Sequence, residues 1–270
     1  MSFDFALLEE LDAGGQRRPL HAAFSAEGGL EALQRDGFHR FRHFLADEDL
    51  ESLREAYGER LLCCKCPRKE LDIACRWDER AAEPFVRVMK DEPLLDFLAD
   101  VCGSPLVAIS MDFFGKAPRS ETAIPRHQDT YTAITGFAWT AERAEANERP
   151  HPVTLWVAPD DVSSENGGME FVAGRHRELL GHKHTSRSMV PESEIQRDER
   201  VDYRLRAGQA GLHHPLAPHR SCPNVTERTR RIFSFQFTPW TPRAQECAAG
   251  PSTDARVVPG APGARSRTGS

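Results

Sequence analysis

The sequence predicts a mainly β fold, a sandwich or jelly-roll barrel, with flanking α-helices. Two observations carry this prediction. Helical periodicity dominates the first hundred residues, whereas short β-rich runs separated by Gly, Pro and Asn dominate after Gly103. Several short strands with irregular loops are typical of sandwiches and jelly rolls. We therefore expect one domain over residues 21–241, with a helical part to about residue 102 and a β-barrel core over about 103–241.

The helical part begins after a predicted flexible arm at residues 1–20. Asp36-Gly37-Phe38 reads as a turn into a short strand over 38–45. Asp47 is placed to cap a helix that starts near Glu48 and carries acidic residues in its first turn. A second helical region is expected over 84–102, because its apolar residues recur at three- or four-residue spacing.

The β-rich part contains short runs of strand-forming residues. These predict strands at 106–114, 154–158, 169–172, 210–214 and 232–238. Residues 141–150 are charged and predict a surface loop, and residues 187–203 predict a long polar insertion of the kind that forms lids or binding loops. Residues 242–270 are rich in Pro, Gly, Ala, Ser and Arg, which predicts a disordered tail.

Composition excludes several classes of function. The net charge is −6 and the pI about 6.0, so no basic excess favours nucleic acid as a partner. The sequence contains no run of 18 apolar residues, so it predicts no membrane span. Its first residues lack the basic region of a signal peptide. Seven cysteines, an odd number, favour a reducing, cytoplasmic setting. The cluster Cys63, Cys64, Cys66 and Cys75 lacks two Cys-x-x-Cys knuckles, so free thiols are favoured over a zinc site.

The candidate chemistry lies in Arg126-His127-Gln128-Asp129. Residues i and i+2 of a strand face the same side, so His127 and Asp129 can bind one metal ion together. A distant His219 would complete two histidines and a carboxylate, the facial triad of non-haem Fe(II) oxygenases. His213 and His214 are rivals for the third position.

His-x-acid pairs also arise by chance, so the pair needs support from its context. A second pair, His176-Arg177-Glu178, follows Gly174 and is interpreted as a structural turn. His182 and His184 beside it are interpreted as a partly exposed cluster rather than a second metal site.

Four ordered motifs supply that context, and over roughly residues 30–240 they resemble the phytanoyl-CoA dioxygenase family. The motifs are Arg126-His127-Gln128-Asp129, the stretch 153–161, the stretch 165–176 and His219-Arg220-Ser221-Cys222-Pro223-Asn224. The resemblance implies an Fe(II)- and 2-oxoglutarate-dependent oxygenase on a double-stranded β-helix, the cupin-like jelly roll. It implies His127, Asp129 and His219 as iron ligands. The family usually has Gly-Ser-His where this chain has Gly174-Arg175-His176, which leaves the substrate open.

Arg230 is the predicted partner of the far carboxylate of 2-oxoglutarate. The family places this arginine eleven residues after the last histidine, and a guanidinium can bind a carboxylate with two hydrogen bonds. Arg228 and Arg231 compete for the role. Strand parity favours Arg230, because it shares a face with Ile232, Ser234 and Gln236, whereas Phe233, Phe235 and Phe237 form the opposite, outward face.

Further candidates follow from the resemblance with less support from the residues. Trp156 matches a family tryptophan near the cosubstrate, and Lys116 stands where the family often has a lysine that could help to hold it; a core tryptophan and a surface lysine are the alternatives. For the primary substrate, the residues expected around the pocket mouth are Gln128, Tyr131, Thr132, Arg175 and the loop 187–203. The segment 64–78 is a possible lid.

The predicted function is hydroxylation of a small molecule by Fe(II), 2-oxoglutarate and dioxygen, with release of succinate and CO2. Desaturation, cyclisation and epimerisation are alternatives, and a natural-product setting is favoured by the Ala-, Arg-, Pro- and Gly-rich composition. Asp129 disfavours a halogenase, in which a small residue leaves room for chloride. Two other classes compete with this prediction. One is a non-catalytic barrel that binds a metal or small acid, and the other is a cupin-like isomerase or hydrolase. The sequence leaves the oligomeric state open.

Overall fold

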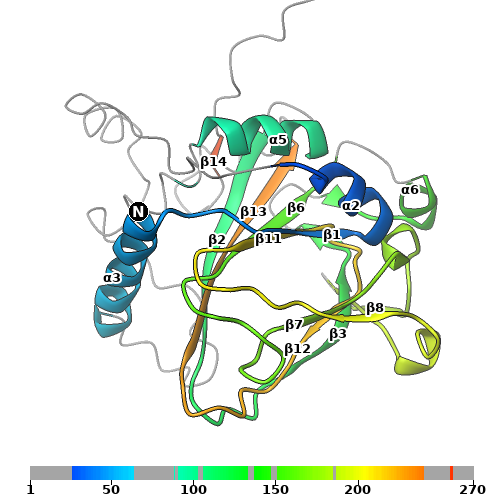
Figure 1. Cartoon of the computed structure of the whole chain (residues 1–270). Coiled ribbons are helices and arrows are strands. Elements are labelled where there is room, and N and C mark those ends of the chain that lie inside the picture. The colour runs from blue at the N-terminus through cyan, green and yellow to red at the C-terminus, as the bar shows by residue number, and fades with distance from the viewer. Residues whose placement is uncertain are drawn as a thin grey trace, which may run out of the picture.

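The computed structural model contains two six-stranded antiparallel sheets that face each other (Figure 1). It describes residues 26–63, 88, 91–102, 106–132, 137–146, 151–184, 187–239 and 256–257. The major sheet has the strand order β1-β11-β6-β13-β2-β14, and the minor sheet has the order β10-β7-β12-β3-β9-β8. This is the predicted double-stranded β-helix, mainly β with a few helices.

The strands and helices have the following bounds. The major sheet comprises β1 (Phe38–Phe41), β2 (Leu106–Lys116), β6 (Val153–Val157), β11 (Ala210–His213), β13 (Arg230–Pro239) and β14 (Arg256–Val257). The minor sheet comprises β3 (Ile124–Asp129), β7 (Met169–Val172), β8 (His182–His184), β9 (Arg187–Met189), β10 (Arg200–Asp202) and β12 (His219–Ser221). A small pair joins β4 (Tyr131–Thr132) and β5 (Phe137–Ala138), and the helical elements are α2 (Gly29–Asp36), α3 (Asp47–Cys63), α5 (Glu92–Cys102), α6 (Ala141–Glu145), η1 (Arg175–Arg177) and η2 (Glu192–Glu194).

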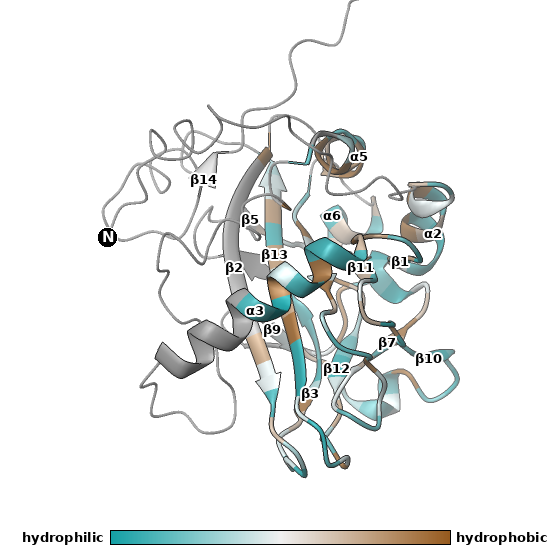
Figure 2. Ribbon diagram, turned by 60° about the vertical axis from the view of Figure 1, so that its left-hand side comes forward, coloured by the Kyte–Doolittle hydropathy of each residue, from teal (hydrophilic) through white to brown (hydrophobic). Residues whose placement is uncertain are grey.

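The outer face of the major sheet packs against helices. Leu94, Leu98 and Val101 of α5 are buried in one cluster with residues of β13. Figure 2 shows the apolar, brown residues of α5 above the sheet. The side chain of Asp91 accepts a hydrogen bond of 3.0 Å from the backbone N–H of Leu94, which caps the start of this helix. The helical first part of the chain thus covers one face of the barrel.

The alternation along β13 separates this outer core from the barrel interior. Phe233, Phe235 and Phe237 lie in the outer cluster with α5, as their parity predicts. Ile232 belongs instead to a second core cluster between the sheets, together with Trp156 and residues of β7 such as Phe171. The two faces of the last long strand are therefore those expected from the sequence.

Some predicted elements need correction. Residues 187–203 are not one long loop, because β9, η2 and β10 lie within them and extend the minor sheet. Residues 141–150 include the short helix α6, whose Ala144 is buried. In the predicted tail, Arg256–Val257 pairs with β2 as β14. Three predicted segments lie outside the described residues: the rest of the tail at 242–270, the arm at 1–20 and the segment 64–78.

Within the described residues, no helix combines the length and apolar character needed to cross a membrane.

Candidate metal centre

His127, Asp129 and His219 come together on the inner face of the minor sheet, and we call them the triad. His127 of β3 lies directly opposite His219 of β12. Nε2 of His127 is 3.6 Å from Oδ1 of Asp129, and Nε2 of His219 is 3.9 Å from Oδ2 of Asp129. One ligand atom from each residue lies within 4.8 Å of the others, and among the described residues no other group of this kind occurs.

Each histidine of the triad is oriented by the carbonyl group two residues before it in the chain. Nδ1 of His127 is 2.8 Å from the carbonyl oxygen of Pro125, and Nδ1 of His219 is 2.9 Å from that of Ala217. When Nδ1–H donates to a carbonyl, the Nε2 lone pair is left for a metal ion. Both Nε2 atoms face Asp129, so the donor set and its tautomers fit a metal ion bound by two histidines and one carboxylate.

The two rival histidines differ in position, and neither belongs to the group of candidate ligands. His214 points away from the triad into a buried cluster with His151, His176 and Trp139, where Nδ1 of His214 accepts a hydrogen bond of 3.0 Å from the N–H of Leu216. His213 stays beside the triad, with its ring centroid 5.1 Å from that of His219.

His176 belongs to the one-turn helix η1, which begins after Gly174 in the left-handed conformation. This bears out its interpretation as a structural turn.

A cavity of about 160 Å³ lies between the sheets beside the triad. The minor sheet contributes the triad, and the major sheet contributes residues of β2, β6, β11 and β13. The described residues that line it are Phe114, Gly115, Lys116, Ile124, His127, Asp129, Thr154, Trp156, Met169, His213, His219, Ser221, Arg230, Ser234 and Gln236. Asp129 is the one acidic residue in this set, and Lys116 and Arg230 are the two strongly basic ones.

Arg230 and Lys116 form a pair of buried cations in the cavity wall. They lie directly opposite each other on β13 and β2, and each residue is 2% exposed. Burial and the nearby Arg230 charge lower the pKa of Lys116 to about 8. Nη2 of Arg230 donates a hydrogen bond to the carbonyl oxygen of Gly167. Two adjacent buried cations are unfavourable unless an anion compensates them.

Lys116 differs from the sequence prediction in its hydrogen bonding. Its ammonium donates to the carbonyl oxygen of Thr122 at 2.9 Å, to Oγ of Ser221 at 3.0 Å and to the carbonyl oxygen of Cys222. An ammonium has three N–H donors, so all three are already engaged. Lys116 can therefore act on a ligand through its charge, but a direct hydrogen bond would require it to give up one of these partners.

Arg231, the rival of Arg230, faces the other way. Its guanidinium donates to both carboxylate oxygens of Asp160, at 2.8 and 2.6 Å. This ion pair keeps Arg231 out of the cavity lining. The strand parity that favoured Arg230 is therefore supported by the geometry of both side chains.

Trp156 also lines the cavity, where its ring stacks on Phe114 with centroids 6.3 Å apart. It therefore packs in the core between the sheets, as the alternative predicts, and also faces the cavity; its contact with a cosubstrate stays a prediction.

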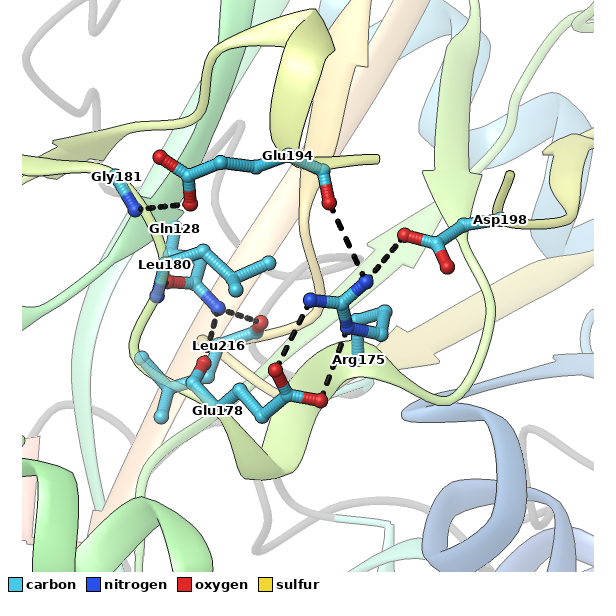
Figure 3. Close-up of polar contacts among 8 residues, drawn as sticks. All are labelled: Gln128, Arg175, Glu178, Leu180, Gly181, Glu194, Asp198 and Leu216. Carbon is cyan, nitrogen blue, oxygen red and sulfur yellow. Dashed lines mark hydrogen bonds and ion pairs between the residues drawn. The ribbon is translucent and has the colours of Figure 1, made fainter. Parts of the chain in front are cut away.

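Gln128 and Arg175 are not placed where the sequence prediction put them (Figure 3). The Gln128 amide donates to the carbonyl oxygens of Glu178 and Leu216, each at 2.7 Å, and accepts from the N–H of Leu180 at 2.8 Å. Its polar atoms are thus engaged with backbone, which favours a structural role over the predicted substrate contact.

Arg175 is likewise committed to protein groups. It forms ion pairs with Glu178, at 2.9 Å, and with Asp198, and it lies outside the cavity lining. These two carboxylates compensate its charge, so the contacts of Arg175 do not support its predicted place at the pocket mouth. The predicted substrate residues Tyr131 and Thr132 form strand β4, and their side chains lie outside what the structure describes.

Two residues that the sequence prediction did not single out hold the cation pair in place. Gly167 adopts φ +90°, and a Cβ there would collide with the Lys116 side chain. The buried amide of Asn224 donates to the carbonyl oxygens of Lys116, Ala117 and Arg228 at 2.8–3.1 Å. Asn224 thus ties the end of β2 to the turn that leads into β13. The signal in the sequence is the pair of motifs Asn166-Gly167-Gly168 and Pro223-Asn224, which belong to the family resemblance without a role assigned to Gly167 or Asn224.

Solved structures with similar folds cover most of the chain. SnoN, a non-haem alpha-ketoglutarate-dependent epimerase from nogalamycin biosynthesis, is 22% identical with a TM-score of 0.60, covering 87% of this chain and 82% of its own. SnoK, a carbocyclase from the same biosynthesis, is 18% identical with a TM-score of 0.61, covering 83% and 87%. AviO1 from Streptomyces viridochromogenes Tue57 is 20% identical with a TM-score of 0.58, covering 86% and 99%. These similarities show the shared fold.

Sequence comparisons identify the family. Phytanoyl-CoA dioxygenase domain-containing protein 1 of Danio rerio is 26% identical over 153 residues, which are 52% of this chain and 48% of that protein. The chain thus matches about half the length of this relative. The profile of the phytanoyl-CoA dioxygenase family matches residues 33–232, which include the triad and Arg230. This chain belongs to the phytanoyl-CoA dioxygenase family.

Proposed function

We propose that this protein is an Fe(II)- and 2-oxoglutarate-dependent dioxygenase that oxidises a small molecule. One observation carries the proposal: a single cavity holds the triad on one sheet and two buried cations on the other. Asp129 is the one carboxylate among the described lining residues, and it belongs to the triad. A dicarboxylate that binds a metal ion at one end and a cation at the other fits this distribution of charge.

The triad would hold Fe(II) through Nε2 of His127, a carboxylate oxygen of Asp129 and Nε2 of His219. Bound iron would supply the oxygen-dependent redox chemistry that amino-acid side chains lack. The contribution of the chain is to fix the imidazole tautomers through Pro125 and Ala217, and to keep three ligand atoms on one side. The proposed overall reaction is substrate plus dioxygen plus 2-oxoglutarate giving hydroxylated substrate, succinate and CO2.

The cation pair would bind the carboxylate of 2-oxoglutarate that lies far from the metal. Arg230 offers the two-pronged donor geometry that suits a carboxylate, and the carbonyl of Gly167 holds its guanidinium in place. Lys116 adds positive charge beside Arg230 while its own hydrogens stay on protein oxygens. Trp156, stacked on Phe114, would contribute an apolar part of the cavity wall.

The oxidation need not end in hydroxylation. SnoN and SnoK carry the names epimerase and carbocyclase, and both come from the biosynthesis of a natural product. We therefore include epimerisation and ring closure among the outcomes for this chain, and we place its small-molecule substrate in secondary metabolism. Action in the cytoplasm is part of the same proposal.

The test is to change each residue of the triad to Ala and measure Fe(II) affinity and 2-oxoglutarate-dependent succinate formation. Each change should weaken Fe(II) binding and nearly abolish succinate formation. Zn²⁺ should compete for the same site but support no turnover, because zinc has no redox chemistry. His43→Ala is the matched control, because this exposed histidine lies outside the cavity lining.

Two outcomes would overturn the proposal. Full activity of His219→Ala would remove the metal assignment and direct attention to His213. Binding of Fe(II) and 2-oxoglutarate without any succinate formation would instead favour a non-catalytic barrel with the same fold.

A further inference from the structure

A row of three hydrogen-bonding side chains crosses the major sheet at the cavity wall, and we call it the polar row. His213 on β11 lies directly opposite Thr154 on β6, and Thr154 lies directly opposite Gln236 on β13. Residues directly opposite each other in antiparallel strands point to the same face of a sheet. All three line the cavity beside the triad.

The side chains of the polar row have no hydrogen-bond partner within the part of the chain that the structure describes. His213 is 2% exposed and Thr154 is 7% exposed. Nδ1 of His213 is fully buried without a partner. Buried polar groups in proteins are nearly always hydrogen-bonded, so groups of this kind around a cavity point to a ligand or water inside it.

The polar row lies far from the cation pair. Gln236 lies six positions after Arg230 on β13, which corresponds to about 20 Å along a strand. A five-carbon diacid anchored at Arg230 is much shorter than this. The His213 ring nevertheless lies only 5.1 Å from the ring of His219, so the polar row borders the candidate metal position itself. The cavity thus has a cationic end for the cosubstrate and an uncharged polar end.

We propose that the polar row is the recognition wall for the primary substrate, and that it selects a neutral group bearing hydroxyl or carbonyl oxygen. This deepens the proposed function and rests on it. His213 and Gln236 can each donate and accept a hydrogen bond, and the Thr154 hydroxyl can do both. Among the described lining residues, every formal charge belongs to the triad or the cation pair, so a charged group at this wall would be desolvated without a counter-charge.

The size of the cavity restricts what enters it. Its volume of about 160 Å³ is smaller than the roughly 300–1,000 Å³ typical of ligand pockets. Once the cosubstrate is bound, the space that remains suits only the reacting end of a larger molecule. The polar row therefore discriminates at the carbon that reacts, and the rest of the substrate extends beyond the cavity.

The experiment uses four probes that share one ring: cyclohexanol, cyclohexanone, cyclohexanecarboxylate and cyclohexylammonium. Their binding to the anaerobic protein loaded with Fe(II) and 2-oxoglutarate is measured by saturation-transfer NMR. Calorimetry of 2-oxoglutarate binding is run first on every variant. The alcohol and the ketone should bind at the cavity, and the two charged probes should not.

The variants His213→Phe, Thr154→Val and Gln236→Leu each remove hydrogen bonding at nearly constant shape. Each should weaken binding of a neutral probe that it contacts by about 3- to 10-fold, the range for loss of a neutral hydrogen bond. The affinity of the same three variants for 2-oxoglutarate should change by less than about 2-fold. His39→Phe on the neighbouring strand β1 is the matched control, because His39 does not line the cavity.

The outcomes separate this inference from the proposed function. If the neutral probes fail to bind the loaded protein, bind no better than the charged ones, or bind all three variants unchanged, the polar row is not the recognition wall. If the wild-type protein fails to bind 2-oxoglutarate in the calorimeter, the proposed function itself is wrong. Loss of 2-oxoglutarate binding in His213→Phe alone would assign that residue to the cosubstrate instead.

Discussion

At the scale of single residues, the donors that a side chain has already used decide what else it can bind. Lys116 and Arg230 are equally buried neighbours, yet their roles differ. The three hydrogens of the Lys116 ammonium are taken by protein oxygens, and Lys116 is therefore an electrostatic partner. Arg230 carries five donors on a planar fork, and its position beside the cavity makes it the better ligand for a carboxylate.

Arg230→Ala should weaken 2-oxoglutarate binding by roughly 30-fold to several-thousand-fold. Loss of one partner of a buried charge pair costs about 2–5 kcal/mol, and each decade corresponds to about 1.4 kcal/mol. Arg230→Lys should recover only part of this loss, because an ammonium lacks the planar fork. Arg231→Ala is the control, since it breaks the ion pair with Asp160 at a residue that does not line the cavity. Calorimetric titration measures the 2-oxoglutarate affinity of each variant. A larger loss of affinity in Arg231→Ala than in Arg230→Ala would mean that the inward and outward faces of β13 must be exchanged.

Gly167 gives a second residue-scale prediction. Gly167→Ala should lower the free energy of unfolding by about 1–3 kcal/mol, because a side chain at φ +90° is strained, and it should also weaken 2-oxoglutarate binding. The second effect arises because the new Cβ displaces Lys116, whose neighbour Arg230 donates to the Gly167 carbonyl. Gly28→Ala is the matched control, with φ +67° and open space around the site. Equal 2-oxoglutarate affinities in the two variants would contradict this account.

The sequence predicts on which face of a strand a side chain lies, because side chains alternate with a period of two. It does not predict hydrogen-bond partners that lie far away along the chain. The i, i+2 spacing placed His127 and Asp129 on one face, and parity separated Arg230 from Arg231. No local pattern reveals that Gln128 binds the backbone of Glu178 and Leu216, which lie 50 and 88 residues away. Such bonds depend on which loops the fold brings together.

At the scale of elements, the turn between β12 and β13 sets the position of the cation pair. Asn224 in this turn is 1% exposed, and its side-chain amide donates to the carbonyl oxygens of Lys116 and Ala117 at the end of β2 and to that of Arg228 before β13. The side-chain Oδ1 of Asn224 accepts hydrogen bonds from the backbone N–H and from the hydroxyl of Thr226, at 3.0 and 2.7 Å. One side chain therefore fixes the strand end that carries Lys116 and the loop that leads to Arg230.

Asn224→Ala should lower the free energy of unfolding by about 2–3 kcal/mol, because several buried backbone groups lose their partners. For a domain of this size that corresponds to a fall in Tm of about 5–10 °C. Val225→Ala is the control, since the neighbouring Val225 is 64% exposed. Calorimetric melting of both variants tests this, and an unchanged Tm for Asn224→Ala would show that the turn is held by other contacts.

Elements with strong periodicity were predicted from the sequence, and short polar strands were not. The helix that starts near Asp47 and the strands β2, β6, β7, β11 and β13 lie close to their predicted positions. The sequence predicts a polar loop where β9 and β10 lie, because strands of three residues carry little alternation. The burial of β10 runs from exposed to half-buried, which gives no apolar face to detect. Their pairing with β3 and β7 is a tertiary effect.

At the scale of the whole molecule, buried polar side chains are not confined to the cavity between the sheets. His151, His176 and His214 form a buried cluster beside Trp139, outside the strands of both sheets. The imidazoles of His151 and His214 lie with centroids 4.4 Å apart, and those of His176 and His214 lie 5.3 Å apart. Gly37 packs directly against His176, so this cluster joins the helical first part of the chain to the barrel.

The His176 cluster should make the protein less stable in acid. Burial first, and then the charges of Arg177 and His151, lower the pKa of His176 from 6.5 to about 4, against an opposing effect of Asp36. Above about pH 6.5 the imidazole is neutral in both the folded and the unfolded chain and has no effect. Below that pH the unfolded chain binds the proton first, so stability falls until about pH 4. Between pH 7 and pH 5 this single group should cost about 2 kcal/mol.

His176→Phe should remove that pH-dependent loss. Neither ring nitrogen of His176 has a hydrogen-bond partner among the described residues, so an apolar ring of similar size gives up no bond there. Denaturant unfolding at pH 7 and pH 5 measures the effect as a difference between the two pH values, which cancels any constant change in packing. His43→Phe, at an exposed position, should keep the wild-type difference. If His176→Phe keeps it too, the acid sensitivity arises elsewhere, and His214, whose pKa is also lowered by burial, is the next residue to change because it lies in the same cluster.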